Sequence, residues 1–417
     1  MSTLAWQIVA TIVKGGIAIF ALLTAFAYMT LVERRVVARM QSRLGPNRVG
    51  PFGLLQPLAD ALKMAFKEQF VPARARLLVF LIAPCVSVFV ALSAFAVIPL
   101  GDTLTWGSGP IAKAWAPSVA GTLNVGLLYL LAISSLAVYG IVLGGWSSGN
   151  RYSLLGALRS AAQMVSYEVS IGLSLAGALM FAGTLSMVGI VHEQVHLGIW
   201  FVLAQPLGFV LYGIAAVAEV NRAPFDLPEA EQELVAGYLT EFSGLRWSLY
   251  QMSEYINMIT VSSLAATVYF GGWTIGANSG ILGVPFVWYV IKVFIFLFVF
   301  IWLRATLPRI RYDRLMRFGW QVLLPLAVAN LVATAIIVTL VPTAAQGWVG
   351  LLWGAGVMLI GTLVYAMRRR RMTRAVPVAK SGVALPDSVR LVRIEPTVLP
   401  APSGRGVGGD VRIPPRS

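Results

Sequence analysis

The chain has little charge and is poor in cysteine and histidine. Only 12% of its 417 residues are charged and 58% are hydrophobic, whereas about 25% of the residues in a soluble domain are charged. Its single cysteine, Cys85, excludes an internal disulfide, a cysteine-based zinc site and an iron–sulfur cluster, because each needs several thiolates. Two histidines also argue against haem ligation. Any redox cofactor that serves this protein must therefore be held by another chain.

The apolar residues are arranged in long runs. These runs are about 20 residues long, the length that crosses a hydrocarbon layer of roughly 30 Å. The sequence therefore predicts an all-α, polytopic bundle of transmembrane helices. The first run lacks a preceding basic segment and is too long for a signal peptide, so we expect it to be retained. Nine spans are predicted, at about 8–32, 78–99, 119–143, 162–186, 199–220, 256–273, 285–304, 321–341 and 349–367.

Basic residues are divided unequally between the two sides of these spans. One side carries 29 of the 32 Lys and Arg residues. Because positively charged loops remain in the cytoplasm, we predict that the N-terminus lies outside and the C-terminus inside. The net charge of +15 follows this membrane pattern, so no nucleic-acid partner is expected. The predicted domains are a transmembrane domain, 1–367, with cytoplasmic loops 34–77, 144–161, 221–255 and 305–320, and a basic tail, 368–417, expected to be disordered.

The first cytoplasmic loop contains a predicted amphipathic helix at 54–67. Leu55, Leu58, Leu62 and Phe66 recur at helical spacing, and charged residues occupy the other face. A helix of this kind lies along the membrane surface. The same position is compatible with an entrance for a lipophilic substrate.

A five-residue pattern of the zinc peptidases occurs at His192, Glu193 and His196. In those enzymes, two histidines one turn apart bind zinc and the glutamate activates water. The chain has no other histidine, and the nearest downstream carboxylate, Glu219, is separated from His196 by a whole span, about 30 Å. We therefore predict no metal site and interpret the pattern as part of a polar outside loop.

Ionisable residues within spans or at their ends are functional candidates because they are costly in lipid. Glu168, placed two turns inside the fourth span, and Lys292, within the seventh, are poorly explained as interfacial anchors. Anchoring explains Glu33, Arg34, Arg35 and Arg304 about as well as function does. Glu219 ends the fifth span, and loop 221–255 adds a dense acidic cluster that could pass protons to the spans. Its members are Asp226, Glu229, Glu231, Glu233, Glu241 and Glu254.

Several stretches together resemble the H subunit of bacterial respiratory complex I, the counterpart of mitochondrial NADH dehydrogenase subunit 1. The resemblance covers about 8–342 and is far more specific than the zinc pattern. It rests on Glu33-Arg34-Arg35, Gly45-Pro46-Asn47-Arg48-Val49-Gly50-Pro51, Gly53-Leu54-Leu55-Gln56-Pro57, Ala59-Asp60, Ala218-Glu219-Val220-Asn221-Arg222-Ala223-Pro224-Phe225-Asp226-Leu227, Glu229-Ala230-Glu231-Gln232-Glu233-Leu234-Val235, Met252-Ser253-Glu254-Tyr255 and Arg304-Ala305-Thr306-Leu307-Pro308-Arg309-Ile310-Arg311-Tyr312-Asp313.

The resemblance implies a membrane subunit of a proton-translocating NADH:quinone oxidoreductase that forms part of the quinone chamber. Quinone, either ubiquinone or menaquinone, would be the substrate and would enter between the first span, the amphipathic helix and the sixth span. FMN and iron–sulfur clusters would belong to hydrophilic partner subunits above the cytoplasmic loops, and small membrane subunits would lie alongside. The implied proton path is Glu168, Glu219, Asp226, Glu229, Glu231, Glu233, Glu241 and Glu254, to which we add Lys292. The implied chamber residues are Glu33, Arg34, Arg35, Asp60, Lys63, Arg222 and Arg304.

Three other interpretations remain open at this point. The homologous subunit of a membrane-bound hydrogenase would need no quinone entrance. A stand-alone cation–proton antiporter would use the intramembrane Lys and Glu, although the chain has no evident internal repeat. A purely structural scaffold would bury Glu168 in a dry pocket.

Overall fold

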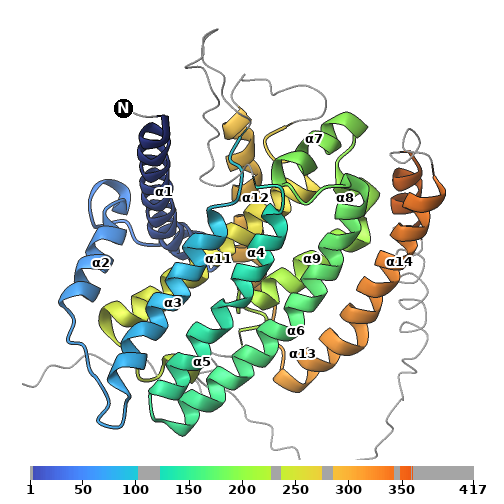
Figure 1. The fold of residues 1–417 in the computed structure, drawn as a ribbon. Coiled ribbons are helices and arrows are strands. Elements are labelled where there is room, and N and C mark those ends of the chain that lie inside the picture. The colour runs from blue at the N-terminus through green and yellow to red at the C-terminus, as the bar shows by residue number, and fades with distance from the viewer. Residues whose placement is uncertain are drawn as a thin grey trace, which may run out of the picture. The chain divides into compact units, whose positions relative to one another are not determined.

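The computed structural model describes residues 3–101, 123–226, 236–274, 285–341, 348–357 and 359. Within these residues every regular element is a helix, which confirms the predicted all-α class (Figure 1). In chain order the principal helices are α1 (Thr3–Met40), α2 (Gln56–Phe66), α3 (Leu77–Phe95), α4 (Gly126–Ser135), α5 (Ala137–Ser147), α6 (Arg151–Ala182), α7 (Met187–Leu197), α8 (Phe201–Ala204), α9 (Pro206–Glu219), α11 (Gly244–Tyr269), α12 (Pro285–Thr306), α13 (Tyr312–Phe318) and α14 (Leu324–Leu340).

Among the described residues, six helical segments are long and apolar enough to cross a membrane. Two shorter apolar helices, Pro206–Glu219 and Trp348–Val357, lie where the fifth and ninth spans were predicted. The sixth predicted span falls on α11, which is 26 residues long and more polar than its neighbours. The six segments are Thr11–Met40, Leu77–Phe95, Gly126–Ser147, Arg151–Ala182, Phe286–Thr306 and Tyr312–Leu340.

Several predicted boundaries were wrong, and the fourth span is the clearest case. The predicted loop 144–161 is mostly helical, because α5 continues to Ser147 and α6 already begins at Arg151. The Asn150 side chain caps α6 by accepting a hydrogen bond from the backbone N–H of Tyr152 at 3.0 Å. Glu168 is therefore about 25 Å along the helix from Arg151 at 1.5 Å per residue, rather than two turns from its end.

Two other loops are also shorter than predicted. α11 begins at Gly244, so Glu254 lies on a helix rather than in the loop 221–255. In the loop 305–320, α13 begins at Tyr312 and joins α14 through a π-helical turn, Gly319–Leu323. The amphipathic helix predicted at 54–67 is confirmed as α2, and its apolar side is exposed.

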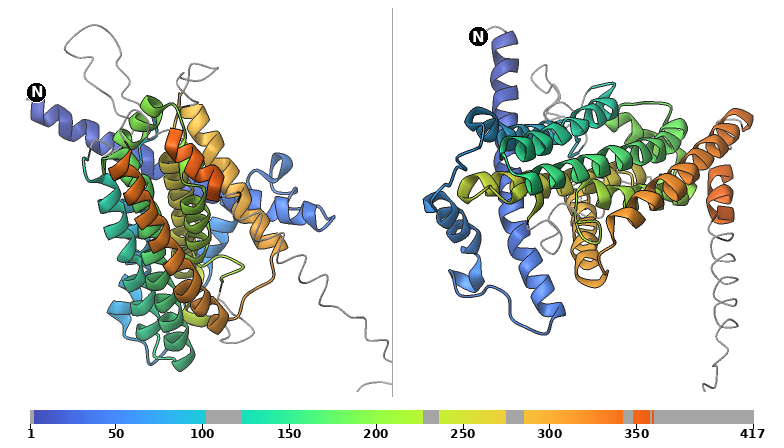
Figure 2. Two further views of the ribbon diagram at one scale, coloured as in Figure 1. Left: turned by 90° about the vertical axis from the view of Figure 1, so that its right-hand side faces the viewer. Right: turned by 90° about the horizontal axis from the view of Figure 1, so that it is seen from below.

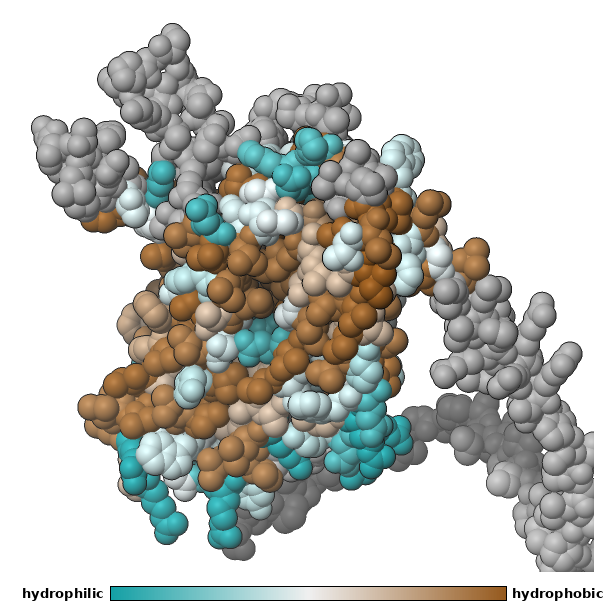
Figure 3. Space-filling view, turned by 45° about the vertical axis from the view of Figure 1, so that its right-hand side comes forward, coloured by the Kyte–Doolittle hydropathy of each residue, from teal (hydrophilic) through white to brown (hydrophobic). Residues whose placement is uncertain are grey.

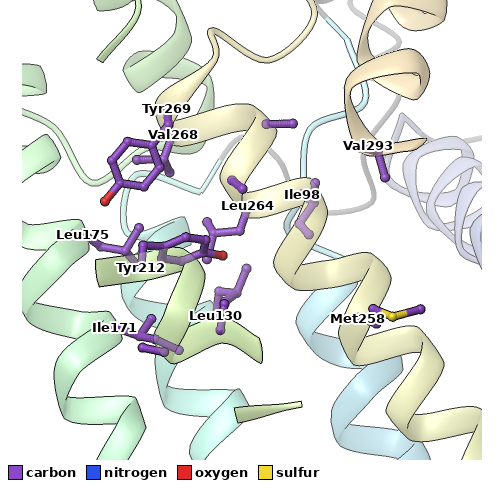
Figure 4. Packing of buried hydrophobic residues seen from close by; sticks show 14 of the residues in the cluster. Ile98, Leu130, Ile171, Leu175, Tyr212, Met258, Leu264, Val268, Tyr269 and Val293 are labelled. Atoms are coloured by element: carbon purple, nitrogen blue, oxygen red, sulfur yellow. The ribbon is translucent and has the colours of Figure 1, made fainter. Parts of the chain in front are cut away.

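Helix α6 lies at the centre of the bundle and packs against α5, α9 and α14. Small residues allow close approach: a Cβ added at Gly156 would come within 2.7 Å of the Gly237 Cα. Figure 4 shows Ile171 and Leu175 of α6 beside Tyr212 of α9. Helices α1 and α2 lie on one side of the bundle and α14 on the other (Figures 1 and 2).

The predicted cytoplasmic loops meet at one end of the bundle. The backbone N–H of Arg76 donates to the Ser147 carbonyl at 3.0 Å, and that of Ile310 donates to the Pro224 carbonyl at 3.1 Å. The Phe70 N–H donates to the Ser243 hydroxyl at 3.2 Å, so the first of these loops also reaches the start of α11. Helices α7 and α8 lie at the opposite end (Figure 1).

Some predictions concern parts of the chain outside the described residues. These are the acidic residues Glu229, Glu231 and Glu233, and the basic tail 368–417.

Candidate functional site

The centre of the candidate site is Glu33, near the end of α1. Its side chain is 8% exposed and forms an ion pair with Arg304 of α12. The other carboxylate oxygen accepts a hydrogen bond of 2.7 Å from the Tyr255 hydroxyl of α11. One buried carboxylate therefore connects three helices, and both of its oxygens have a polar partner.

Tyr255 links Glu33 to a second charged pair. The guanidinium carbon of Arg222 lies 4.1 Å from the centre of the Tyr255 ring. Arg222 also pairs with Glu254 at 3.8 Å, and the Tyr238 hydroxyl donates to Glu254 at 3.0 Å. Arg222 is only 8% exposed, so its charge depends on these contacts. A continuous chain of polar contacts thus runs from Arg304 through Glu33 and Tyr255 to Arg222 and Glu254.

This chain of contacts borders a polar pocket of about 670 Å³. The pocket lies between the end of α1, the loop that follows it, and the facing ends of α11 and α12. Its charged and aromatic lining includes Glu33, Arg34, Arg43, Arg222, Trp247, Tyr255 and Arg304.

An apolar pocket of about 330 Å³ lies further along the same three helices. On α1 its lining runs from Ala18 to Val32, and the polar pocket takes over at Glu33. On α12 the apolar lining ends at Leu297 and the polar lining includes Arg304. The groove between α1, α11 and α12 therefore changes from apolar to polar along its length.

Of the sequence-predicted chamber residues on α1 and α2, Glu33 and Arg34 line the polar pocket, and Arg34 links α1 to α2. Arg34 donates to Asp60 at 2.6 Å, and Gln56 donates to the other oxygen of Asp60 at 3.0 Å. Arg35 donates to the Pro46 carbonyl at 3.3 Å, which holds the loop after α1 against that helix. Lys63 is exposed in the last turn of α2.

Glu219 and Glu168 form a second group, at the interface of α9 and α6. Glu219 lines a cavity of about 30 Å³ together with Ser134, Asn257 and Thr260, and that volume has room for one or two water molecules. Glu168 lies on the facing helix α6, close enough to Glu219 for the two carboxylates to interact electrostatically. Within the part of the chain that is described, neither carboxylate has an ion-pair partner.

Asp226 lies beyond these groups, at the end of the segment that follows α9. Its carboxylate is 3.9 Å from the Arg309 guanidinium. The Gln163 amide of α6 donates to the carbonyls of Ala218 and Phe225, at 2.8 and 2.9 Å, and so fixes this segment beside α6.

Two predicted site residues lie apart from both groups. The Lys292 ammonium donates to the carbonyls of Phe270, Gly272 and Thr274 at 2.6, 2.8 and 2.6 Å, which places it at the C-terminal end of α11. Glu241 accepts a hydrogen bond of 2.8 Å from Asn150 and faces a different pocket, which also contains Arg74 and Arg151.

The zinc-peptidase pattern lies on helix α7, so its interpretation as a loop was wrong. His192 and His196 are exposed, and the His192 ring is 6.3 Å from the Trp273 ring in an edge-on arrangement. In the described ranges, no group of three His, Cys, Asp or Glu side chains is arranged to hold a metal ion.

The sequence interpretation missed the polar residues that connect the charged ones, chiefly Tyr255, Tyr238 and Asn257. One signal was present: Glu254, Asn257 and Thr260 recur every three residues, which puts them on one face of a helix. If the helix had been predicted to start at Gly244, these three residues would have been identified as one polar face of α11.

The fold and the site define a multi-pass membrane protein in which an ion pair joins α1 to α12 and a second, largely buried pair joins the segment after α9 to α11. Residues 13–335 match the family model described as NADH dehydrogenase. The H subunit of the NADH-quinone oxidoreductase of Deinococcus deserti is 54% identical over 331 residues, covering 78% of this chain and 83% of the relative. The H subunit from Thermomicrobium roseum is 52% identical over 80% of this chain and 97% of its own, and subunit 8 of the Thermus thermophilus enzyme is 52% identical over 78% and 86%.

The chain therefore belongs to the H-subunit family of NADH-quinone oxidoreductase. It is a membrane subunit of that enzyme complex, as the resemblance implied.

Proposed function

We propose that the groove between α1, α11 and α12 is part of the quinone chamber. The observation that carries the proposal is the change from the apolar pocket to the polar pocket along the same three helices. A quinone has the same division, with an isoprenoid tail and a polar ring. The guanidinium groups of Arg34, Arg222 and Arg304, which line the polar pocket, offer hydrogen-bond donors to the ring oxygens.

Helix α2 supports an entrance from the bilayer at the side of this groove. It contacts α1 and α11, and Arg34 holds it through Asp60. Its side chains Leu58, Leu62 and Phe66 are 58%, 51% and 87% exposed. An amphipathic helix with this uncovered apolar face rests at the membrane surface, where a lipophilic substrate arrives.

We propose further that the buried carboxylates couple quinone reduction to proton movement. The path begins at Glu33 and Tyr255, passes Arg222 and Glu254, and continues to Glu219 and Glu168. Asn257 lies one helical turn from Glu254, about 4.5 Å along the axis, and lines the cavity of Glu219. Asn257 and water in that cavity would bridge the two groups. Asp226, Glu229, Glu231 and Glu233 would extend the path toward the cytoplasmic loops.

Lys292 and Glu241 have no place in the path we propose. Lys292 is held by three carbonyls at the far end of α11, and Glu241 faces another pocket. Arg34, Arg35, Asp60 and Lys63 would shape the chamber mouth.

We infer the topology from the meeting of the basic loops at one end of the bundle. Nine spans would put the N-terminus outside and the C-terminus in the cytoplasm of a bacterial plasma membrane, with 1–367 as the membrane domain and 368–417 as the tail. The hydrophilic subunits that carry FMN and iron–sulfur clusters would cover the cytoplasmic loops. The chain itself would hold no redox cofactor and would take its electrons from them, while small membrane subunits would contact it laterally.

Replacing Glu219 with Gln in the intact complex tests the coupling proposal. Gln has nearly the same shape and size as Glu but cannot take up or release a proton, so we expect NADH:quinone reductase activity to fall at least roughly tenfold. Glu193→Gln on α7 is the matched control and should retain activity. Assembly is checked by size-exclusion chromatography of the complex. Full activity and full proton pumping in Glu219→Gln would overturn the proposal.

Two further measurements separate this function from the alternatives. Inhibition of the parent complex by quinone-site blockers distinguishes a quinone chamber from the corresponding part of a membrane-bound hydrogenase. Reconstitution of the chain alone should give no cation transport; transport by the isolated chain would identify it as an antiporter.

A further inference from the structure

A second polar pocket lies at the turn between α5 and α6, away from the quinone groove. Its volume is about 780 Å³, which is large enough for a phospholipid headgroup. Two arginines, Arg74 and Arg151, line it together with Tyr152, Asn150 and the carboxylate of Glu241.

Backbone contacts fix the two arginines relative to one another. The backbone N–H of Arg76 donates to the Ser147 carbonyl at 3.0 Å, so the segment carrying Arg74 is tied to the end of α5. Gly149 has a φ of +66°, and a Cβ there would come within 2.8 Å of the Arg74 carbonyl oxygen. This close approach, which glycine permits, brings Arg74 beside the start of α6, where Arg151 is the first residue.

Asn150 positions the acidic member of the pocket. Its side-chain oxygen caps α6, and its amide donates to Glu241 at 2.8 Å. The geometry therefore holds two cations and one carboxylate around one space before any ligand arrives.

The charges of the pocket leave one positive charge to be balanced. Arg74 and Arg151 are exposed, and within the described part of the chain neither forms an ion pair. With Glu241 counted against them, the lining carries a net charge of about +1 at neutral pH. A ligand with a single negative charge and additional hydrogen-bond donors matches this set.

The pocket lies where the lipid-facing surface gives way to polar residues. Leu78 at the start of α3 is 70% exposed, and Leu155 and Leu158 on α6 are 45% and 52% exposed. Trp146 at the end of α5 is 45% exposed, and the Arg76 guanidinium stacks 4.7 Å from the centre of its ring. Figure 3 shows a broad apolar face bounded by hydrophilic side chains at this end of the bundle. Exposed Trp beside Arg is typical of the headgroup level of a membrane.

We propose that this pocket binds the headgroup of a monoanionic phospholipid of the phosphatidylglycerol type. The phosphodiester would lie between the guanidinium groups of Arg74 and Arg151, which bind phosphate oxygens in a fork geometry. A headgroup hydroxyl would donate to Glu241, and the acyl chains would follow the exposed leucines of α3 and α6. Basic pockets at the cytoplasmic ends of spans bind anionic lipids in this way. The continuous apolar surface beside the pocket favours a lipid over an acidic protein segment.

Native mass spectrometry of the purified complex in detergent tests the proposal. The complex is titrated with phosphatidylglycerol and with phosphatidylethanolamine of the same acyl composition. We expect the double variant Arg74→Gln/Arg151→Gln to retain phosphatidylglycerol roughly 10- to 30-fold more weakly than the unchanged complex, with little change for phosphatidylethanolamine. The matched control, Arg314→Gln/Arg317→Gln, removes two exposed arginines from the same end of the bundle and should have no effect.

Further arms keep the proposal open to refutation. Arg74→Lys/Arg151→Lys retains both charges but loses the fork geometry, so it should bind phosphatidylglycerol more tightly than the glutamine variant and less tightly than the unchanged complex; binding by this variant also shows that the pocket remains folded. Equal retention of phosphatidylglycerol in the glutamine variant would overturn the proposal. Displacement of the lipid by inorganic phosphate at equal concentration would identify a free-anion site instead. A photo-reactive amino acid at Tyr152 should capture lipid; capture of another subunit would show that a protein covers the pocket.

Discussion

The hydroxyl of Tyr255 offers a sharp test of the chamber, because Tyr255→Phe removes one oxygen and keeps the ring. The phenylalanine ring would keep the cation–π contact with the Arg222 guanidinium and the packing against Phe26, whose ring centre lies 5.6 Å from that of Tyr255. What is lost is the 2.7 Å hydrogen bond to Glu33. A hydrogen bond to a charged group contributes about 1.5–3 kcal/mol. Because Glu33 keeps its ion pair with Arg304, the complex should still assemble.

We expect this change to lower quinone reductase activity more than it lowers the amount of assembled complex. If the hydroxyl stabilises the charge that develops during quinone reduction, 1.5–3 kcal/mol corresponds to a decrease of roughly 10- to 100-fold in kcat/KM at about 1.4 kcal/mol per tenfold change. The assay is NADH oxidation with a soluble quinone in membranes that contain the complex. NADH oxidation with an artificial acceptor that bypasses quinone measures the amount of assembled enzyme.

Tyr139→Phe is the matched control, since that tyrosine is 62% exposed and lies on α5, which does not line the groove between α1, α11 and α12. Wild-type kcat/KM in Tyr255→Phe, with normal artificial-acceptor activity, would refute the reasoning that Glu33 and Tyr255 act together on quinone. An equal fall in both activities would show that the hydroxyl supports assembly instead.

Three further changes should separate stability from activity. Arg222→Gln removes the cation that lies 3.8 Å from the Glu254 carboxylate. It should destabilise the protein by about 3–5 kcal/mol, which is measured as a loss of assembled complex. Normal assembly would show that this ion pair is not needed for stability. Lys292→Met removes three charge-assisted hydrogen bonds at the end of α11. It should lower the thermal midpoint of the complex without changing the KM for quinone. A changed KM would show that Lys292 takes part in the quinone reaction. Leu62→Glu puts a charge on the exposed apolar side of α2. It should raise the KM for a long-tailed quinone and leave the KM for a short-tailed analogue unchanged. An equal rise in both KM values would show that α2 does not form the entrance.

The parts of the fold that depend on local patterns were predictable from the sequence. Helix α2 was expected at 54–67 and is found at Gln56–Phe66, because its apolar residues recur at a helical period over a short window. The start of α6 was missed by eleven residues, since Ser153, Gly156, Ser160 and Gln163 interrupt the apolar run. Those residues are buried against other helices, where small and hydrogen-bonded side chains are tolerated.

The partners within the site were not predictable in the same way. Glu33 and Arg304 are recognisable singly as charges at helix ends, yet their pairing depends on the packing of α1 beside α12. The role of Lys292 also depends on tertiary structure, because its three acceptors belong to the turn after α11. A span-by-span interpretation identifies which charges are costly and leaves open which groups neutralise them.

The carboxylates of the candidate site fall into two kinds according to whether an arginine pairs with them. Glu33 and Glu254 each face an arginine and a tyrosine hydroxyl, so a full negative charge on them is balanced where it stands. Glu219 and Glu168 have no ion-pair partner in the described part of the chain, and Glu219 lines a cavity with room for water. A proton gained or lost at this second pair changes the net charge of the α6–α9 interface. A proton gained at Glu254 would leave the charge of the buried Arg222 less well balanced, and one gained at Glu33 would weaken its ion pair with Arg304. Under the proposed coupling, Glu219 and Glu168 are therefore expected to hold the exchanged proton between turnovers, while Glu33 and Glu254 would pass it on and keep Arg304 and Arg222 at the polar pocket.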